Sequence, residues 1–446
     1  MSPDRRAVPA ALLLAALLLA PGPVKAAEAG GGTTTLGFQS AKELAVKNNL
    51  AMRLAKAQTD AARGQVLQAA AELLPNLLGT AFQNRTYKVN LAAEGLAFPG
   101  FPMLLGPYNT FDARIHLAQR LFDLSALRRY QSSRRRSAIT ALEEGLAREQ
   151  VSAAAGLSYV EALRADKAQE AALADLDLAD ALKTLAQNQH QAGVATGIDV
   201  ARARTRAAQA RLKLLETRVA RRQAYLRLER VVGLPLRGDV VLADSLSPGT
   251  TAAPTLEEAV QAALAERLEL RIARERLEAD RTALGGVRAQ YLPSLALNGD
   301  YGWSANDPAT NGHATGGAGV ALQLPLWTGG SLQGRSEEAE AAVAGSEAAL
   351  QDLASQVDED VRLATETLLA AADEVNTAQE VVQLTERELQ LARDRFSSGV
   401  ADNIELVNAQ DALAGSRDAE VASLSRFHVA RINLALALGR MEAFRI

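Results

Sequence analysis

Apolar positions recur with a helical period along most of this chain. In the tract after Pro325, large apolar residues occur every seven positions, and small residues follow three positions behind them. One large and one small position per heptad is typical of a coiled-coil seam. The pattern predicts a very long helix with lateral helical partners, although an ordinary antiparallel bundle has the same heptads. The large set is Val361, Leu368, Val375, Val382, Leu389 and Phe396, and the small set is Ala364, Ala371, Ala378, Thr385 and Ala392.

Two short windows have a period of two instead. They lie near 75–122 and 291–327 and carry glycines, asparagines and most of the aromatic residues of the chain. In the run 111–117, odd positions are apolar and even positions are polar, and 294–303 alternates in a similar way. Runs of about ten residues with one apolar face are typical of transmembrane β-strands. Aromatic residues at the strand ends favour this prediction over a soluble two-sided hairpin.

The two halves of the chain resemble each other. The segment 50–56 aligns with 268–274, and Gly193-Val194 aligns with Gly399-Val400. Self-similarity at one long period indicates duplication of a whole unit, which reads helix, strand, strand, long helix, turn, helix. The sequence therefore predicts a first repeat at 27–233 with helices at 40–74, 124–189 and 197–233 and a β-hairpin at 76–122, a linker at 234–254, and a second repeat at 255–446 with helices at 256–292, 329–396 and 402–438 and a β-hairpin at 294–327.

The first 26 residues have the pattern of a cleavable signal peptide. Arg5 and Arg6 precede a short apolar run at 10–20, and small residues around Ala26 provide a cleavage site. The apolar run is too short to span a bilayer as a helix, which disfavours the alternative of an N-terminal membrane anchor. We therefore expect an exported protein.

Composition excludes several classes of protein. The 446 residues carry a formal net charge of −4, which argues against a nucleic-acid partner. The sequence has no cysteine, so thiolate metal sites and cysteine nucleophiles are excluded. Its four histidines are scattered without the spacing of metal ligands, and no common catalytic motif occurs. We expect no metal site, no cofactor and no enzyme activity.

The number of predicted strands bears on the oligomeric state. One chain provides four membrane strands, and lipid does not tolerate an open sheet edge. Twelve strands from three chains are the simplest closed arrangement that leaves a passage. The predicted fold class is mainly α with a small β part, in which a duplicated unit forms a homotrimer. Its 12-stranded β-barrel in membrane lipid would continue as a long α-helical barrel.

A more specific motif ends the longest heptad tract. Arg395-Phe396-Ser397-Ser398-Gly399-Val400 is followed by Ile404-Glu405-Leu406-Val407-Asn408-Ala409. This segment is similar to the turn of the TolC-type outer-membrane factor family of Gram-negative bacteria, and the repeats extend the resemblance over most of the chain. The resemblance implies an outer-membrane exit duct with a periplasmic helical domain, which serves a tripartite efflux pump or a type I secretion system. It also implies a periplasmic adaptor and an inner-membrane transporter as partners, whereas a soluble periplasmic coiled-coil scaffold is the alternative.

The resemblance further implies functional positions at the turns between helices. The residues that would form periplasmic tips and dock the adaptor are Gly193, Val194, Arg395, Phe396, Gly399 and Val400. Those that would line a constriction or gate are Asp199, Glu405 and Asn408. Acids in the first turn of a helix also stabilise the helix dipole without any such role. The sequence departs from the family pattern at Gln189 and His190, where the family has Arg and an aromatic residue, and at Asn408, where some members carry an acid.

Overall fold

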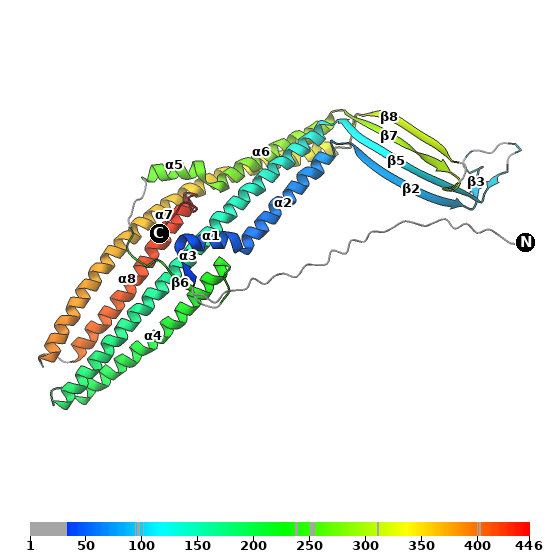
Figure 1. The fold of residues 1–446 in the computed structure, drawn as a ribbon. Helices are drawn as coiled ribbons and strands as arrows, with labels where there is room; N and C mark the ends of the chain where they lie inside the picture. The colour runs from blue at the N-terminus through cyan, green and yellow to red at the C-terminus, as the bar shows by residue number, and fades with distance from the viewer. Residues whose placement is uncertain are drawn as a thin grey trace, which may run out of the picture.

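The computed structural model of this chain describes residues 34–93, 95, 99–100, 102–236, 240–249, 255–309, 312–398, 400 and 403–446. The predicted signal peptide at 1–26 lies outside the described residues, and so does Gly399. The molecule is elongated, with a β-sheet at one end of a long helical body and two helical hairpins at the other end (Figure 1).

Two helices of nearly equal length run through the helical body. α3 (Leu124–Gln191) has 68 residues and α7 (Ser331–Ser397) has 67. At a rise of about 1.5 Å per residue, each spans about 100 Å. The sequence predicts 124–189 and 329–396 for these helices. Shorter helices accompany them, with α2 (Leu50–Ala71) and α6 (Leu268–Arg288) toward the sheet and α4 (Gly197–Val232) and α8 (Asn403–Ala437) toward the other end.

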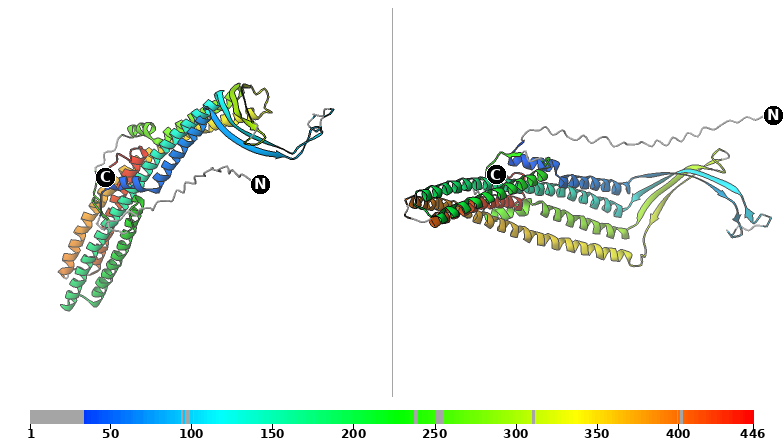
Figure 2. Two further views of the ribbon diagram at one scale, coloured as in Figure 1. Left: turned by 45° about the vertical axis from the view of Figure 1, so that its right-hand side comes forward. Right: turned by 90° about the horizontal axis from the view of Figure 1, so that it is seen from below.

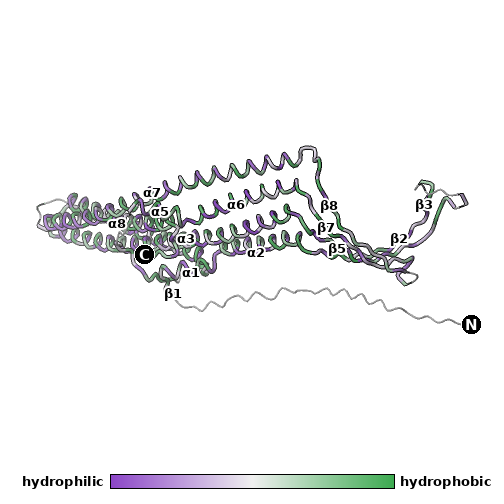
Figure 3. Tube along the Cα trace, turned by 90° about the horizontal axis from the view of Figure 1, so that it is seen from above, coloured by the Kyte–Doolittle hydropathy of each residue, from purple (hydrophilic) through white to green (hydrophobic). Residues whose placement is uncertain are grey.

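The helices lie side by side in a curved wall (Figure 2). In the half next to the sheet, the order is α2-α3-α6-α7, which is seen clearly in Figure 3, and in the other half it is α4-α3-α8-α7. Most of the predicted heptad seam of α7 packs inside this wall, because Val361, Leu368, Val375 and Leu389 are buried against neighbouring helices. Among the helices of the described residues, none combines the length and apolarity needed to cross a membrane.

The prediction of one continuous helix at 40–74 and another at 256–292 is wrong. The structure divides the first of these into α1 (Phe38–Asn48) and α2, and the second into α5 (Leu256–Glu266), α6 and the 3-10 turn η1 (Ala289–Tyr291). The breaks fall at Asn49 and Arg267, where ψ is 141° and 128°. The Asn49 side chain accepts a hydrogen bond of 2.8 Å from the Ala51 N–H, so it caps α2 and stabilises the break.

Four strands form one antiparallel sheet in the order β2-β5-β7-β8. β5 and β7 come from different predicted repeats, and their pairing sets Arg114 opposite Gly302. The first hairpin continues beyond the sheet into a short pair, β3 (Val89–Asn90) and β4 (Leu104–Leu105). The sheet strands are β2 (Asn76–Thr86), β5 (Tyr108–Phe122), β7 (Ser294–Ala305) and β8 (His313–Gln323).

A parallel strand pair near the middle of the molecule is absent from the prediction. β1 (Thr34–Leu36) pairs with β6 (Val240–Leu242), which lies within the predicted linker. The buried Tyr159 of α3 holds this pair in place, because its hydroxyl donates to the Asp244 carboxylate at 2.7 Å and lies 3.0 Å from the Leu36 carbonyl oxygen. Strands of three residues are too short to give a readable period, so the sequence pattern carries no signal for them.

Candidate functional site at the helical tips

The end opposite the sheet consists of two turns between antiparallel helices (Figure 1). We call residues 189–199, between α3 and α4, the first tip, and residues 395–408, between α7 and α8, the second tip. In the first tip, Gly193 has a φ of 80°, the left-handed conformation in which many helices end. This conformation favours glycine, which explains the residue type at this position.

Hydrogen bonds within the first tip satisfy the last carbonyl groups of α3. The Val194 N–H donates to the Gln189 carbonyl oxygen at 2.9 Å, and the Gly193 N–H donates to the His190 carbonyl oxygen at 3.0 Å. The Nδ1 atom of His190 lies 2.9 Å from the Ala195 carbonyl oxygen and is the donor, since a carbonyl oxygen only accepts. His190 therefore supports the turn through a polar contact at a position where the resemblance implies an aromatic residue.

Asp199 begins α4 and is engaged in the cap of that helix. Its carboxylate accepts hydrogen bonds from the Thr196 hydroxyl at 2.6 Å and from the Thr196 N–H at 2.9 Å. The hydroxyl contact lowers the pKa of Asp199 below its usual value of 3.8. Asp199 thus caps the start of α4.

The second tip brings Arg395 and Glu405 together. The Arg395 Nε atom lies 3.4 Å from Glu405 Oε1, and both side chains are about half exposed. An exposed ion pair of this kind contributes less than about 1 kcal/mol. Asn408 lies one helical turn after Glu405 on α8 and is exposed. The Val400 N–H donates to the Arg395 carbonyl oxygen at 3.0 Å, which closes the loop after α7.

Phe396 lies inside the second tip and not on its surface. Its side chain is 4% exposed and packs in a small core with Leu182 of α3 and Leu406 of α8. The protomer therefore leaves Phe396 almost no exposed area for a docking contact. The ring instead holds the two helices of the second tip against the first hairpin.

The exposed apolar residues of the tips occupy equivalent positions in the two repeats. Val194 and Val400 are 63% and 72% exposed. Ile198 and Ile404, four residues further along in each tip, are 58% and 42% exposed. The predicted docking residues include the two valines but not the isoleucines, although both pairs recur at the same spacing between the repeats.

Among the described residues of the tips, two hydrogen bonds join the first tip to the second. Gln189 Nε2 donates to the Phe396 carbonyl oxygen at 3.1 Å, and Asn403 Nδ2 donates to the Asp199 carbonyl oxygen at 2.8 Å. Asn403 is almost fully buried, so its amide has little access to competing water. Sequence periodicity carries no signal for these contacts, because their partners are more than 200 residues apart in the chain.

Ion pairs also join α4 to α8, further from the ends of the two tips. Arg206 and Lys213 of α4, one heptad apart, pair with Asp411 and Asp418 of α8 at 2.6 and 2.8 Å. Both pairs therefore bridge the same two helices at equivalent positions of successive heptads. Within the part of the chain that the structure describes, no cluster of three or more His, Asp or Glu side chains could hold a metal ion.

A protein family model, several known proteins and solved structures are similar to this chain. A family model described as outer membrane efflux protein matches residues 42–234 and 259–440. The alkaline protease secretion protein AprF of Pseudomonas aeruginosa is 26% identical over 323 residues, which span 69% of this chain and 65%, just under two thirds, of that protein. The probable efflux pump outer membrane protein TtgC of Pseudomonas putida is 25% identical over 90% of this chain and 82% of its own length. The crystal structure of the outer membrane protein VceC of Vibrio cholerae shares the fold, with a TM-score of 0.78 and 22% identity over 90% of this chain and 96% of that chain.

Proposed function

This chain belongs to the outer membrane efflux protein family, and from that premise we propose that it is the outer-membrane exit duct of a tripartite efflux pump or a type I secretion system. A homotrimer would receive substrates from a periplasmic adaptor and an inner-membrane transporter and release them outside the cell. Relatives support both variants, because AprF is named for protease secretion and TtgC for efflux. The family is named for transport, and we propose no catalytic reaction.

The observation that carries this proposal is the open four-stranded sheet. In the order β2-β5-β7-β8, the outer edges of β2 and β8 have no neighbouring strand among the described residues. Unpaired backbone N–H and C=O groups are not tolerated in lipid. Pairing β8 of one protomer with β2 of the next would remove both edges, and three protomers would close a barrel of twelve strands.

The edges of the helical wall also need a neighbour. On α7, Leu363, Leu384 and Leu391 fall on one heptad stripe, and each is at least 58% exposed. On α4, at the opposite edge of the wall, Leu212 and Leu215 are more than half exposed. Apolar stripes at coiled-coil spacing are stabilised by burial against another helix, so a second copy of this chain fits both edges.

One face of the sheet is suited to lipid. Ile115 and Tyr301 face each other across β5 and β7, and Ala113 faces Trp303 in the same way. Ile115, Tyr301 and Trp303 are all exposed on this face, where the protomer has nothing to cover them. This pattern supports outer-membrane lipid as a partner of the sheet. In the proposed duct, the helical body extends into the periplasm, and the segment 1–26 is the export signal.

The tips support a docking and gating role. We propose that the adaptor contacts the exposed apolar side chains of both tips and the predicted docking residues Gly193, which sets the first turn, and Gly399 of the second tip. Arg395 would support this apolar surface through its ion pair with Glu405, and Phe396 would support it through the core beneath the second tip. Asp199, Glu405 and Asn408 would border the constriction, whose opening would separate the hydrogen bonds that join the tips.

The experiment that tests the proposal measures the native mass and shape of the protein after detergent extraction from purified outer membranes. We expect a particle of three protomers, on the order of 140 Å long from the helical tube plus the membrane barrel. Reconstitution of that particle should then give ion conductance. A monomer in the soluble periplasmic fraction would refute the duct and would favour the coiled-coil scaffold.

A further inference from the structure

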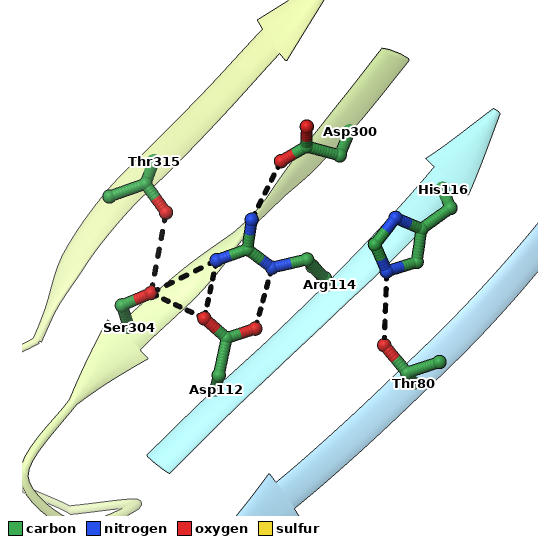
Figure 4. A network of polar contacts seen from close by, with 7 residues as sticks. All are labelled: Thr80, Asp112, Arg114, His116, Asp300, Ser304 and Thr315. Atoms are coloured by element: carbon green, nitrogen blue, oxygen red, sulfur yellow. Dashed lines mark hydrogen bonds and ion pairs between the residues drawn. The ribbon is translucent and has the colours of Figure 1, made fainter. Parts of the chain in front are cut away.

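A charged network covers the polar face of the sheet, opposite the face that carries Ile115 and Trp303 (Figure 4). Asp112 and Arg114 are two residues apart on β5, so their side chains lie on the same face. Asp300 and Ser304 of β7 and Thr315 of β8 share that face. In the proposed duct this face lines the passage, because the opposite face contacts lipid.

Arg114 is held flat against the sheet by both carboxylates. Its Nε and Nη2 atoms donate to the two Asp112 oxygens, the first at 2.6 Å, and its Nη1 donates to Asp300 Oδ2 at 2.8 Å. The Ser304 hydroxyl donates to Asp112 Oδ2 at 2.6 Å and lies 3.4 Å from the Thr315 hydroxyl. The guanidinium therefore lies across β5 and β7 and does not project away from the sheet.

Gly302 makes this position of Arg114 possible. It pairs directly with Arg114, and a Cβ atom at Gly302 would lie 2.2 Å from the Arg114 Cβ and 2.5 Å from the Ala113 carbonyl oxygen. Any larger residue would thus displace the strand or the arginine. The glycine opens the path along which Arg114 reaches Asp300, two residues away on the neighbouring strand.

The network carries a net negative charge and exposes it unevenly. One guanidinium is set against two carboxylates, and Asp112 is the more covered of the two, with 14% of its side chain exposed against 34% for Asp300. We propose that the Asp112–Arg114–Asp300 network is an ion-selectivity element of the passage, in which Asp300 presents the excess negative charge and favours cationic over anionic permeants. This inference rests on the proposed function, because it needs the polar face to line a conducting passage.

One charge has a modest effect on the local concentration of a permeating ion, but the proposed trimer repeats this effect in each protomer. A unit charge about 8 Å from a permeating ion in water changes the ion's local population roughly twofold. The proposed trimer has one network per protomer, and cations and anions respond in opposite directions. Neutralising Asp300 should therefore lower the ratio of cation to anion permeability by roughly threefold or more at low ionic strength.

The test measures the reversal potential of the reconstituted full-length protein in a planar bilayer under a KCl gradient. Asp300→Asn should shift the reversal potential toward that of chloride, and Arg114→Gln, which leaves two uncompensated carboxylates, should shift it toward that of potassium. Asp300→Glu keeps the charge and is the matched control, with an expected reversal potential like that of the wild type.

Three results would overturn the inference. They are an unchanged reversal potential in Asp300→Asn, a shift of Asp300→Asn and Arg114→Gln in the same direction, and a shift in Asp300→Glu as large as that in Asp300→Asn. Any of these would mean that the network only fixes the register of β5 and β7. Failure of the wild-type protein to form trimers or to conduct would refute the proposed duct itself, so the two failures are distinguishable.

Discussion

Lys42 is a buried cation on which the C-terminal segment depends. Its side chain is part of α1 and only 4% exposed. The Nζ atom donates three hydrogen bonds, to the carbonyl oxygens of Met441 at 2.9 Å, Glu442 at 3.1 Å and Phe444 at 2.8 Å. Burial lowers the pKa of Lys42 below its usual value of 10.5, so the ammonium is retained at a cost that these carbonyl groups offset. We predict that Lys42→Met releases the C-terminal segment from α1.

The magnitude follows from the three contacts. A hydrogen bond from a charged donor contributes about 1.5–3 kcal/mol, so loss of all three removes roughly 5–9 kcal/mol of gross interaction. Methionine preserves most of the stem volume and abolishes the desolvation cost of the ammonium, which is several kcal/mol for a buried ion. Water can also reach the Glu442 carbonyl group once the segment loosens, because Glu442 is an exposed residue. We therefore expect a net local destabilisation of about 2–4 kcal/mol.

Native-state hydrogen exchange of the detergent-extracted protein measures this local stability directly. The Phe444 N–H, which donates to the Met441 carbonyl oxygen at 3.3 Å, lies within the segment. Its exchange should accelerate by roughly 30-fold to several hundredfold in Lys42→Met. Lys47→Met, an exposed lysine on the same helix, is the control and should leave the rate unchanged. Equal exchange in Lys42→Met and the wild type would refute the argument that this ammonium holds the segment.

Three further predictions concern the oligomer, the tips and pH. Leu384→Glu on the exposed stripe of α7 should convert the trimer into smaller species by size-exclusion chromatography with light scattering, whereas the neighbouring exposed Gln383→Glu should not; a stable Leu384→Glu trimer would contradict the proposed interface. Asn403→Ala removes one tip-to-tip hydrogen bond worth about 1 kcal/mol, so single-channel recordings should show roughly fivefold more frequent opening, with Asn433→Ala, an exposed residue of α8 outside the tips, as control; unchanged opening in Asn403→Ala would exclude its bond as a latch. Burial lowers the pKa of His428 below 6.5, so the unfolded state binds more protons than the folded state below pH 6.5. The free energy of unfolding should therefore fall by up to about 1.4 kcal/mol per pH unit as the pH decreases from there. In thermal unfolding between pH 7.5 and 5.5, His428→Gln should flatten this slope, and an equally steep slope in that variant would assign the dependence to other groups.

The sequence determined the elements that depend on local spacing. The heptads predict a long helix near the observed position of α7, since Val361, Leu368 and Val375 are buried at successive seven-residue intervals on one helix face, and the internal repeat predicts its counterpart near α3. Alternation of apolar and polar residues predicts the hairpin strands for the same reason, because successive strand residues point to opposite faces. The repeat locates both tips and the valine at each of them.

Only the tertiary structure decided which residues meet across long stretches of chain. It placed Phe396 in a core instead of on a surface, joined the tips through Gln189 and Asn403, and set Arg114 beside Asp300. It also broke two predicted helices, one of them at Asn49, whose amide reaches the Val231 carbonyl oxygen at 3.2 Å. These contacts join residues far apart in the sequence, and a single sequence carries no periodic signal for them. Local periodicity therefore fixed the helices and strands, whereas packing between distant segments decided the site.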